Sequence, residues 1–120
     1  MKMLNDFNCN CPIYLASGYT DLRRGIDGLA TIIEKQFKLE SCTNALFLFC
    51  GRRTDRIKGL YWEGDGFLLL YKRLEKGKFQ WPRKSEECVT ITPQQYRWLM
   101  EGLNIIQPKS TQKISGIKFS

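Results

Sequence analysis

The sequence contains no histidine among its 120 residues. Histidine is the most frequent general base of enzymes and a frequent metal ligand, so its absence counts against acid–base catalysis near neutral pH. A cysteine nucleophile would lack an imidazole partner for the same reason. The acidic residues show no strand-borne pair of the kind that metal-dependent phosphoryl transfer needs. The candidates are Asp21, Asp27, Asp55, Glu63 and Asp65. We therefore predict no enzymatic activity, no catalytic residue and no cofactor.

Long apolar stretches are also missing. No run reaches the length of about 18 residues that suggests a membrane span. The first residues, Met1 to Asp6, lead into polar residues and form no apolar signal core. We therefore expect a cytoplasmic protein with no membrane partner.

The cysteines are few, odd in number and irregularly spaced: Cys9, Cys11, Cys42, Cys50 and Cys88. Zinc sites usually combine two pairs of Cys or His ligands, with about two to four residues between the members of a pair. Only one residue separates Cys9 from Cys11, and the others are scattered. We predict no metal site and, in a reducing compartment, reduced thiols. Cys42, Cys50 and Cys88 are expected to be small buried hydrophobic residues.

The charge is strongly positive, with 19 Lys and Arg against 12 Asp and Glu, a net charge of +7. Such an excess suits a polyanionic partner. It also lies within the range of about 2–8 that keeps a small domain soluble. The distribution of the charge along the chain must therefore decide between the two explanations.

The apolar pattern predicts an α+β fold: an antiparallel meander of about four to five strands with one longer and one shorter helix. Residues 1–106 are expected to form a single domain with a loose N-terminal arm, and residues 107–120 a basic, mobile tail. The strand-like segments are 13–16, 45–50, 56–63, 67–74, 79–81 and 88–91.

Local signals mark where the two predicted helices begin. The longer helix is expected to begin at Thr20, which can cap the first turn. Gly25 and Gly28 inside it suggest that another part of the chain packs closely there. The shorter helix follows Thr92, which forms a capping box with Gln95.

Positive charge is concentrated in segment 51–84, which holds ten of the nineteen basic residues and six aromatic residues. Basic groups neutralise phosphates, and aromatic faces stack on bases. Pairing of adjoining strands is expected to bring Arg56 and Lys58 near Lys72 and Arg73 on one basic face. The alternative is a solvated outer face with most aromatics in the core. The predicted nucleic-acid-binding residues are Arg52, Arg53, Arg56, Lys58, Lys72, Arg73, Lys76, Lys78, Trp62 and Trp81.

A series of motifs extends over about three quarters of the chain. They are YLA at 14–16, TDLRRGIDGL at 20–29, LFLF at 46–49, GRRTDRIK at 51–58, Trp62, GDGF at 64–67, KRLE at 72–75, Gly77, Phe79, Trp81-Pro82, Leu99 and Glu101-Gly102. Segment 13–103 thereby resembles the small accessory protein of the insertion-sequence-sixty-six family, which is encoded upstream of a large transposase. The resemblance implies a role in transposition beside a separate, catalytic transposase.

Charge pattern and resemblance together predict a non-catalytic accessory protein of a bacterial insertion sequence. We expect it to bind nucleic acid, such as the DNA of the element ends, through a basic strand and turn face. The transposase and other proteins of the same element are the expected protein partners. The alternative is a protein–protein adaptor without direct DNA contact, which an exposed apolar patch around Trp81 and Pro82 would favour.

Overall fold

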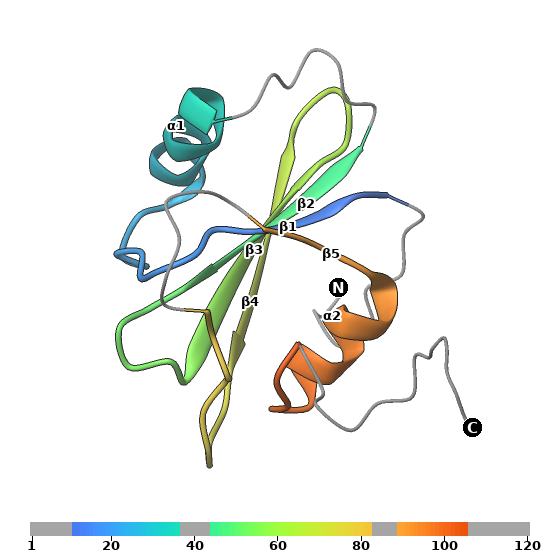
Figure 1. The fold of residues 1–120 in the computed structure, drawn as a ribbon. Helices are drawn as coiled ribbons and strands as arrows, with labels where there is room; N and C mark the ends of the chain where they lie inside the picture. Colours follow the sequence, from blue (N-terminus) through green and yellow to red (C-terminus); the bar gives the residue numbers. More distant parts are fainter. Residues whose placement is uncertain (1–10, 37–43, 83–88, 106–120) are drawn as a thin grey trace, which may run out of the picture.

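The computed structural model describes residues 11–36, 44–82 and 89–105. In these residues the chain forms β1 (Ile13–Leu15), α1 (Ile26–Gln36), β2 (Ala45–Cys50), β3 (Arg56–Trp62), β4 (Phe67–Arg73), β5 (Val89–Ile91) and α2 (Pro93–Met100). The strands form one sheet in the order β4-β3-β2-β1-β5 (Figure 1). The predicted α+β fold, with one longer and one shorter helix, is confirmed. The expected N-terminal arm at 1–11 and the tail at 107–120 lie outside the described residues, except for Cys11, which packs against the core.

One strand pair of the sheet is parallel. β1 pairs with β2 in the same direction, while β1–β5, β2–β3 and β3–β4 are antiparallel. The antiparallel meander therefore runs through β2, β3 and β4, and β1 lies between β2 and β5. Parallel neighbours need a crossover connection, and the segment that contains α1 supplies it.

The core is divided between the two faces of the sheet, because successive side chains of a strand point in opposite directions. β2 is buried on both faces. Its residues Leu46 and Leu48 belong to the cluster that includes Leu99 of α2, whereas Phe47 and Phe49 pack with the side chains of α1. The two helices accordingly lie on opposite sides of the sheet (Figure 1).

The longer helix begins at Ile26, six residues after the predicted start at Thr20. The intervening segment forms a turn around Asp21. The Asp21 carboxylate accepts a hydrogen bond from the Arg23 N–H at 3.0 Å, and its carbonyl accepts one from the Arg24 N–H at 3.2 Å. A side chain that bonds to nearby backbone in this way competes with helix formation, which explains the delay.

Two other local predictions need correction. A Cβ added to Gly25 would meet nothing within 4 Å, so the expected close packing is wrong there. At Gly28 an added Cβ would lie 3.0 Å from the Arg24 Cβ, which is a close approach within the same segment. Residues 79–82 form no strand, although Phe79 is buried.

The capping box of the second helix is confirmed. The Gln95 N–H donates to the Thr92 hydroxyl oxygen at 3.1 Å, and the Thr92 N–H donates to the Gln95 side-chain oxygen at 2.9 Å. Pro93 occupies the first helical position, where a missing N–H costs nothing. These signals act within four residues, which is why sequence alone locates this helix.

Two of the five cysteines, Cys11 and Cys50, lie within the described residues. Cys50 is a free, buried thiol, and burial is the main cause that raises its pKa to about 12. Cys11 is disulfide-bonded, so the expectation that all the thiols are reduced is wrong for this residue. Cys9, Cys42 and Cys88 lie outside the described residues, and so does the expected burial of Cys42 and Cys88.

Within the parts of the chain that the structure describes, no helix is long and apolar enough to cross a membrane.

Candidate nucleic-acid interface

A groove of about 890 Å³ opens on the side of the sheet that carries α1. Its walls come from three stretches of the chain: the loop after β1, the turn after β2, and the strands β3 and β4. One lining residue, Asp21, is acidic. Five are basic, and we call this site the basic groove after them: Arg23, Arg52, Arg53, Arg56 and Lys58.

The walls meet because two parallel strands end at the same edge of the sheet. The Ala16 N–H donates to the Leu48 carbonyl at 2.9 Å, and the Thr20 N–H donates to the Cys50 carbonyl at 2.8 Å. These bonds continue the pairing of β1 with β2 beyond the strand itself. In open α/β sheets the loops that follow parallel strands are common ligand sites, and β1 and β2 form one such parallel pair here. Here they bring Arg23 beside the turn after β2.

The turn after β2 holds Arg52 and Arg53 at its exposed tip. The Thr54 N–H donates to the Gly51 carbonyl at 3.0 Å, and the Thr54 carbonyl accepts a bond from the Phe79 N–H at 2.7 Å. Thr54 has a φ of 58°, a left-handed conformation that β-branched residues rarely adopt. Surrounding bonds must impose such a conformation, and strained residues of this kind cluster at functional sites.

Strand β3 supplies the floor of the basic groove. Arg56 and Lys58 alternate with Ile57, so both face the α1 side. The Lys58 ammonium donates to the Arg24 carbonyl at 3.0 Å, which ties the strand to the loop after β1. The Arg56 guanidinium donates to the Asp55 carboxylate at 3.0 Å, and it keeps about a third of its side chain exposed.

Asp21 keeps its charge in this setting. The Arg23 side chain and N–H donate to its carboxylate at 2.9–3.0 Å, and these bonds lower the pKa of Asp21 to about 2. Arg23 is therefore partly neutralised. Among the described residues, Arg52 and Arg53 have no carboxylate partner, so their charges are the most available to an anion.

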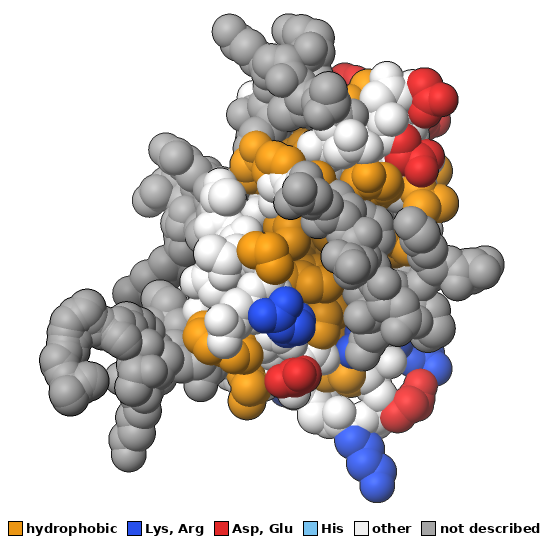
Figure 2. All heavy atoms as spheres, turned by 90° about the vertical axis from the view of Figure 1, so that its right-hand side faces the viewer, with side chains coloured by type: hydrophobic (Ala, Val, Ile, Leu, Met, Phe, Trp, Pro, Cys, Tyr) orange, Lys and Arg blue, Asp and Glu red, His pale blue; other side chains and the backbone are white. Residues whose placement is uncertain are grey.

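The predicted single basic face is wrong with respect to Lys72. Arg56 pairs with Arg73 and Ile57 with Lys72, so Lys72 points to the α2 side of the sheet. Its ammonium donates to the Met100 carbonyl at 3.0 Å, and burial lowers its pKa. Figure 2 shows the side of the molecule toward α2, where the Lys and Arg side chains of the described residues, in blue, lie apart from one another.

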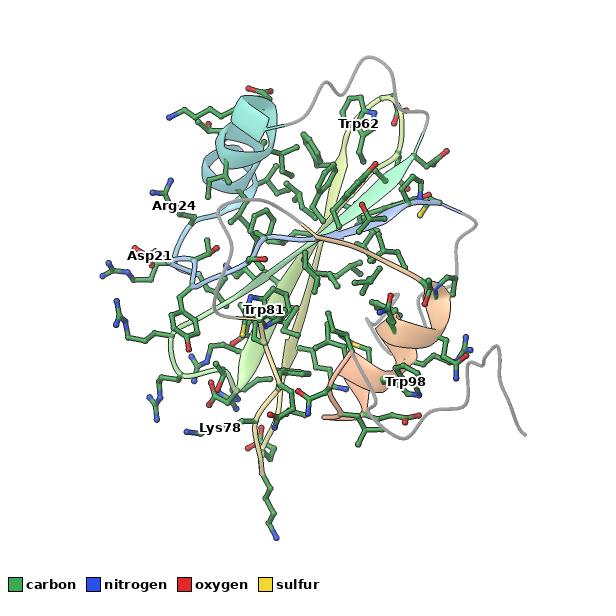
Figure 3. All side chains as sticks on the ribbon, in the orientation of Figure 1. Asp21, Arg24, Trp62, Lys78, Trp81 and Trp98 are labelled. Carbon is green, nitrogen blue, oxygen red and sulfur yellow. The ribbon has the colours of Figure 1, made fainter. Side chains whose placement is uncertain are left out.

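The other predicted basic residues lie outside the groove lining. Arg73 is on the same face as Arg56 and forms an exposed ion pair with Glu75 at 3.1 Å. Lys76 and Lys78 are exposed in the turn after β4. Figure 3 shows Lys78 near one end of the sheet, apart from the flank that carries Asp21 and Arg24.

The two predicted stacking residues are not presented to a ligand. Trp81 is only 6% exposed, and its indole N–H donates to the Ala16 carbonyl at 3.1 Å. Trp62 is half-buried against Phe67, with ring centroids 4.9 Å apart, in the cluster beneath α1. The prediction that either ring stacks on a base is therefore corrected.

Two exposed aromatic residues line the basic groove instead. Tyr19 is 40% and Tyr71 is 48% exposed. The Arg52 guanidinium lies 6.0 Å from the centroid of the Tyr19 ring. Sequence reasoning missed Tyr19 and Arg23 as site residues, because their placement depends on the parallel pairing of β1 with β2. Tyr71 could have been found, since it pairs with Lys58 across the hairpin.

Carboxylates do not gather around a metal site in the part of the chain that is described. No group of three or more Cys, Asp or Glu side chains there could hold an ion. Asp21 and Asp55 are each ion-paired to an arginine. The charged side chains that line the basic groove are five cations and one carboxylate.

Residues 11–110 match the family described as IS66 Orf2 like protein. Two uncharacterized proteins of Sinorhizobium fredii (strain NBRC 101917 / NGR234) are similar in sequence. One, y4hO, is 33% identical over 102 residues, which cover 85% of this chain and 89% of the relative. The other, y4jC, is 32% identical over 92 residues, which cover 77% and 79%. No solved structure matches the chain.

Proposed function

The chain belongs to the IS66 Orf2 like family of insertion-sequence accessory proteins, and we propose that its basic groove binds nucleic-acid phosphates during transposition. The family match confirms the resemblance that the sequence motifs indicate. In this proposal the chain acts in the cytoplasm beside the transposase and other proteins of the same element. It contributes binding, and the transposase contributes the chemistry.

The observation that carries the proposal is the convergence of charge. Five basic side chains and one acidic side chain line one groove, and they come from two separate stretches of the chain, residues 21–23 and 52–58. Charge that served only solubility would have no need to converge, because like charges repel when they are brought together. A polyanion offsets that repulsion and releases counterions when it binds.

The types of side chain also suit a phosphodiester. Arg52 and Arg53 are exposed and without carboxylate partners among the described residues. A guanidinium can donate two parallel hydrogen bonds to phosphate oxygens. Arg56 and Lys58 are held in place by hydrogen bonds to the Asp55 carboxylate and to the Arg24 carbonyl.

The adaptor alternative has lost the feature that would favour it. An exposed apolar patch at Trp81 and Pro82 would favour that alternative. Trp81 is instead buried and hydrogen-bonded to Ala16. We therefore favour direct contact with nucleic acid.

The test is a salt titration with matched charge removals. The variant Arg52→Gln/Arg53→Gln loses two charges from the basic groove. The control Lys76→Gln/Lys78→Gln loses two exposed charges from the turn after β4. Binding of a fluorescein-labelled element-end duplex and of a scrambled duplex is followed by fluorescence anisotropy.

The groove variant should reduce the slope of log affinity against log salt by about 2, since each phosphate contact contributes about 0.9. Both duplexes should be affected alike, because phosphate contacts carry no sequence information. The control should leave the slope nearly unchanged. Equal losses in the two variants would refute the groove as the binding site.

A further inference from the structure

We infer that the basic groove accepts single-stranded nucleic acid, with unpaired bases stacked on Tyr19 and Tyr71 beside the arginines that bind the phosphates. This inference rests on the proposed function and names the substrate class of the same site. It depends on three features: selective exposure of two aromatic rings, the cations placed against them, and the size of the groove.

The exposure of the two rings is selective. Of the twelve aromatic side chains in the described residues, ten are buried or partly buried, among them Phe47, Phe79 and Trp81. Tyr19 and Tyr71 are 40% and 48% exposed, and both line the groove. Tyr19 comes from the loop after β1 and Tyr71 from β4, so the rings belong to different walls. Neither ring is needed to fill the core.

Each of these rings lies beside a cation. The Arg52 guanidinium is 6.0 Å from the Tyr19 centroid. Tyr71 lies opposite Lys58 across the β3–β4 hairpin, on the same face of the sheet. Single-strand-binding sites combine positively charged groups that follow the backbone with aromatic faces that stack on successive bases. The groove offers both groups at once.

A duplex does not suit these features. Its bases are stacked on one another and present only their edges in the grooves, so tyrosine faces gain nothing from it. A volume of about 890 Å³ is typical of sites that enclose small ligands, about 300–1,000 Å³, and is consistent with nucleotide units. Neither described helix offers a basic face for the major groove, because α1 exposes Asp27 and Glu34 and α2 carries one basic residue, Arg97.

The experiment compares three probes by fluorescence anisotropy. They are an oligothymidylate of about eight nucleotides, within the site sizes of known single-strand binders, an abasic strand of equal length, and the element-end duplex. The abasic strand keeps the phosphates and removes the bases. Tyr19→Leu and Tyr71→Leu remove the rings, whereas Tyr19→Phe keeps a ring. Circular dichroism establishes that each variant is folded.

The wild-type chain should bind the oligothymidylate more tightly than the abasic strand. Each leucine variant should lose about 5- to 150-fold in affinity for the oligothymidylate, as expected for one base–aromatic stack. Its affinity for the abasic strand should stay within about twofold of the wild-type value. Tyr19→Phe should bind like the wild type.

Two outcomes separate this inference from the proposed function. If the duplex binds most tightly, the leucine variants bind normally and Arg52→Gln/Arg53→Gln still weakens binding, the single-strand inference is overturned and the proposed function stands. If no probe responds to removal of the groove arginines, both fail together.

Discussion

The turn that presents Arg52 and Arg53 can be broken by one substitution at Thr54. Proline fixes φ near −65° and has no N–H, whereas Thr54 has a φ of 58° and donates its N–H to the Gly51 carbonyl at 3.0 Å. We expect a cost of about 3 kcal/mol, which covers both the incompatible backbone and the lost hydrogen bond. The free energy of unfolding of Thr54→Pro should therefore fall by about 3 kcal/mol.

Thr54→Gly is the matched control, because glycine adopts positive φ freely. Relief of the left-handed conformation, about 1–2 kcal/mol, is offset by the greater freedom of glycine in the unfolded chain and by loss of the Thr54 hydroxyl bond to Arg53. Its free energy of unfolding should stay within about 1 kcal/mol of the wild-type value.

Urea denaturation followed by circular dichroism measures both variants. With a slope of about 2 kcal/mol per molar, Thr54→Pro should move the midpoint down by roughly 1.5 M. At a temperature where both variants are folded, only Thr54→Pro should lose affinity for nucleic acid, because Arg52 and Arg53 are displaced. Equal midpoints for the proline and glycine variants would refute the positive φ and the account of how the turn positions the site.

Three further predictions concern single side chains. Asp21 has a pKa of about 2 when folded, below its usual 3.8, so its contribution to stability is present above pH 4 and is lost as the pH falls toward 2. Asp21→Asn should remove this pH dependence of stability in acid titrations followed by circular dichroism. The same variant should bind nucleic acid more tightly, because one negative charge leaves the groove. Trp81→Phe should cost about 1–3 kcal/mol in urea denaturation, because the part-buried Ala16 carbonyl loses its donor, while the affinity of the folded variant stays unchanged. Cys50 should resist N-ethylmaleimide at pH 8 until the chain unfolds, as peptide mass mapping would show, because burial keeps the thiol protonated and covered.

Signals that act over a few residues made parts of the fold predictable. The capping box at Thr92 and Gln95 located α2, and the alternation of β3 and the Gly64 to Gly66 turn located the hairpin. The start of α1 was misplaced because Asp21 offers the backbone a competing turn. The parallel pairing of β1 with β2 joins segments about 30 residues apart, and no local pattern specifies it.

Some residues of the basic groove could likewise be predicted from the sequence, and others could not. Dense charge in the sequence indicated Arg52, Arg53, Arg56 and Lys58, all of which line the basic groove. The error over Lys72 was avoidable, since the register of the hairpin places it opposite Ile57 and therefore on the other face. Tyr19 and Arg23 could not be assigned from sequence, because the loop after β1 reaches the groove only through the parallel pair.

The most direct test of the basic groove as a nucleic-acid site is a titration of the ¹⁵N-labelled chain with oligothymidylate, followed by amide chemical shifts. The account predicts that the largest shifts occur in residues 19–23 and 51–56, whose backbones form two walls of the groove. Shifts that instead concentrate in the Gly64 to Gly66 turn and in α2, with the groove residues unchanged, would contradict it.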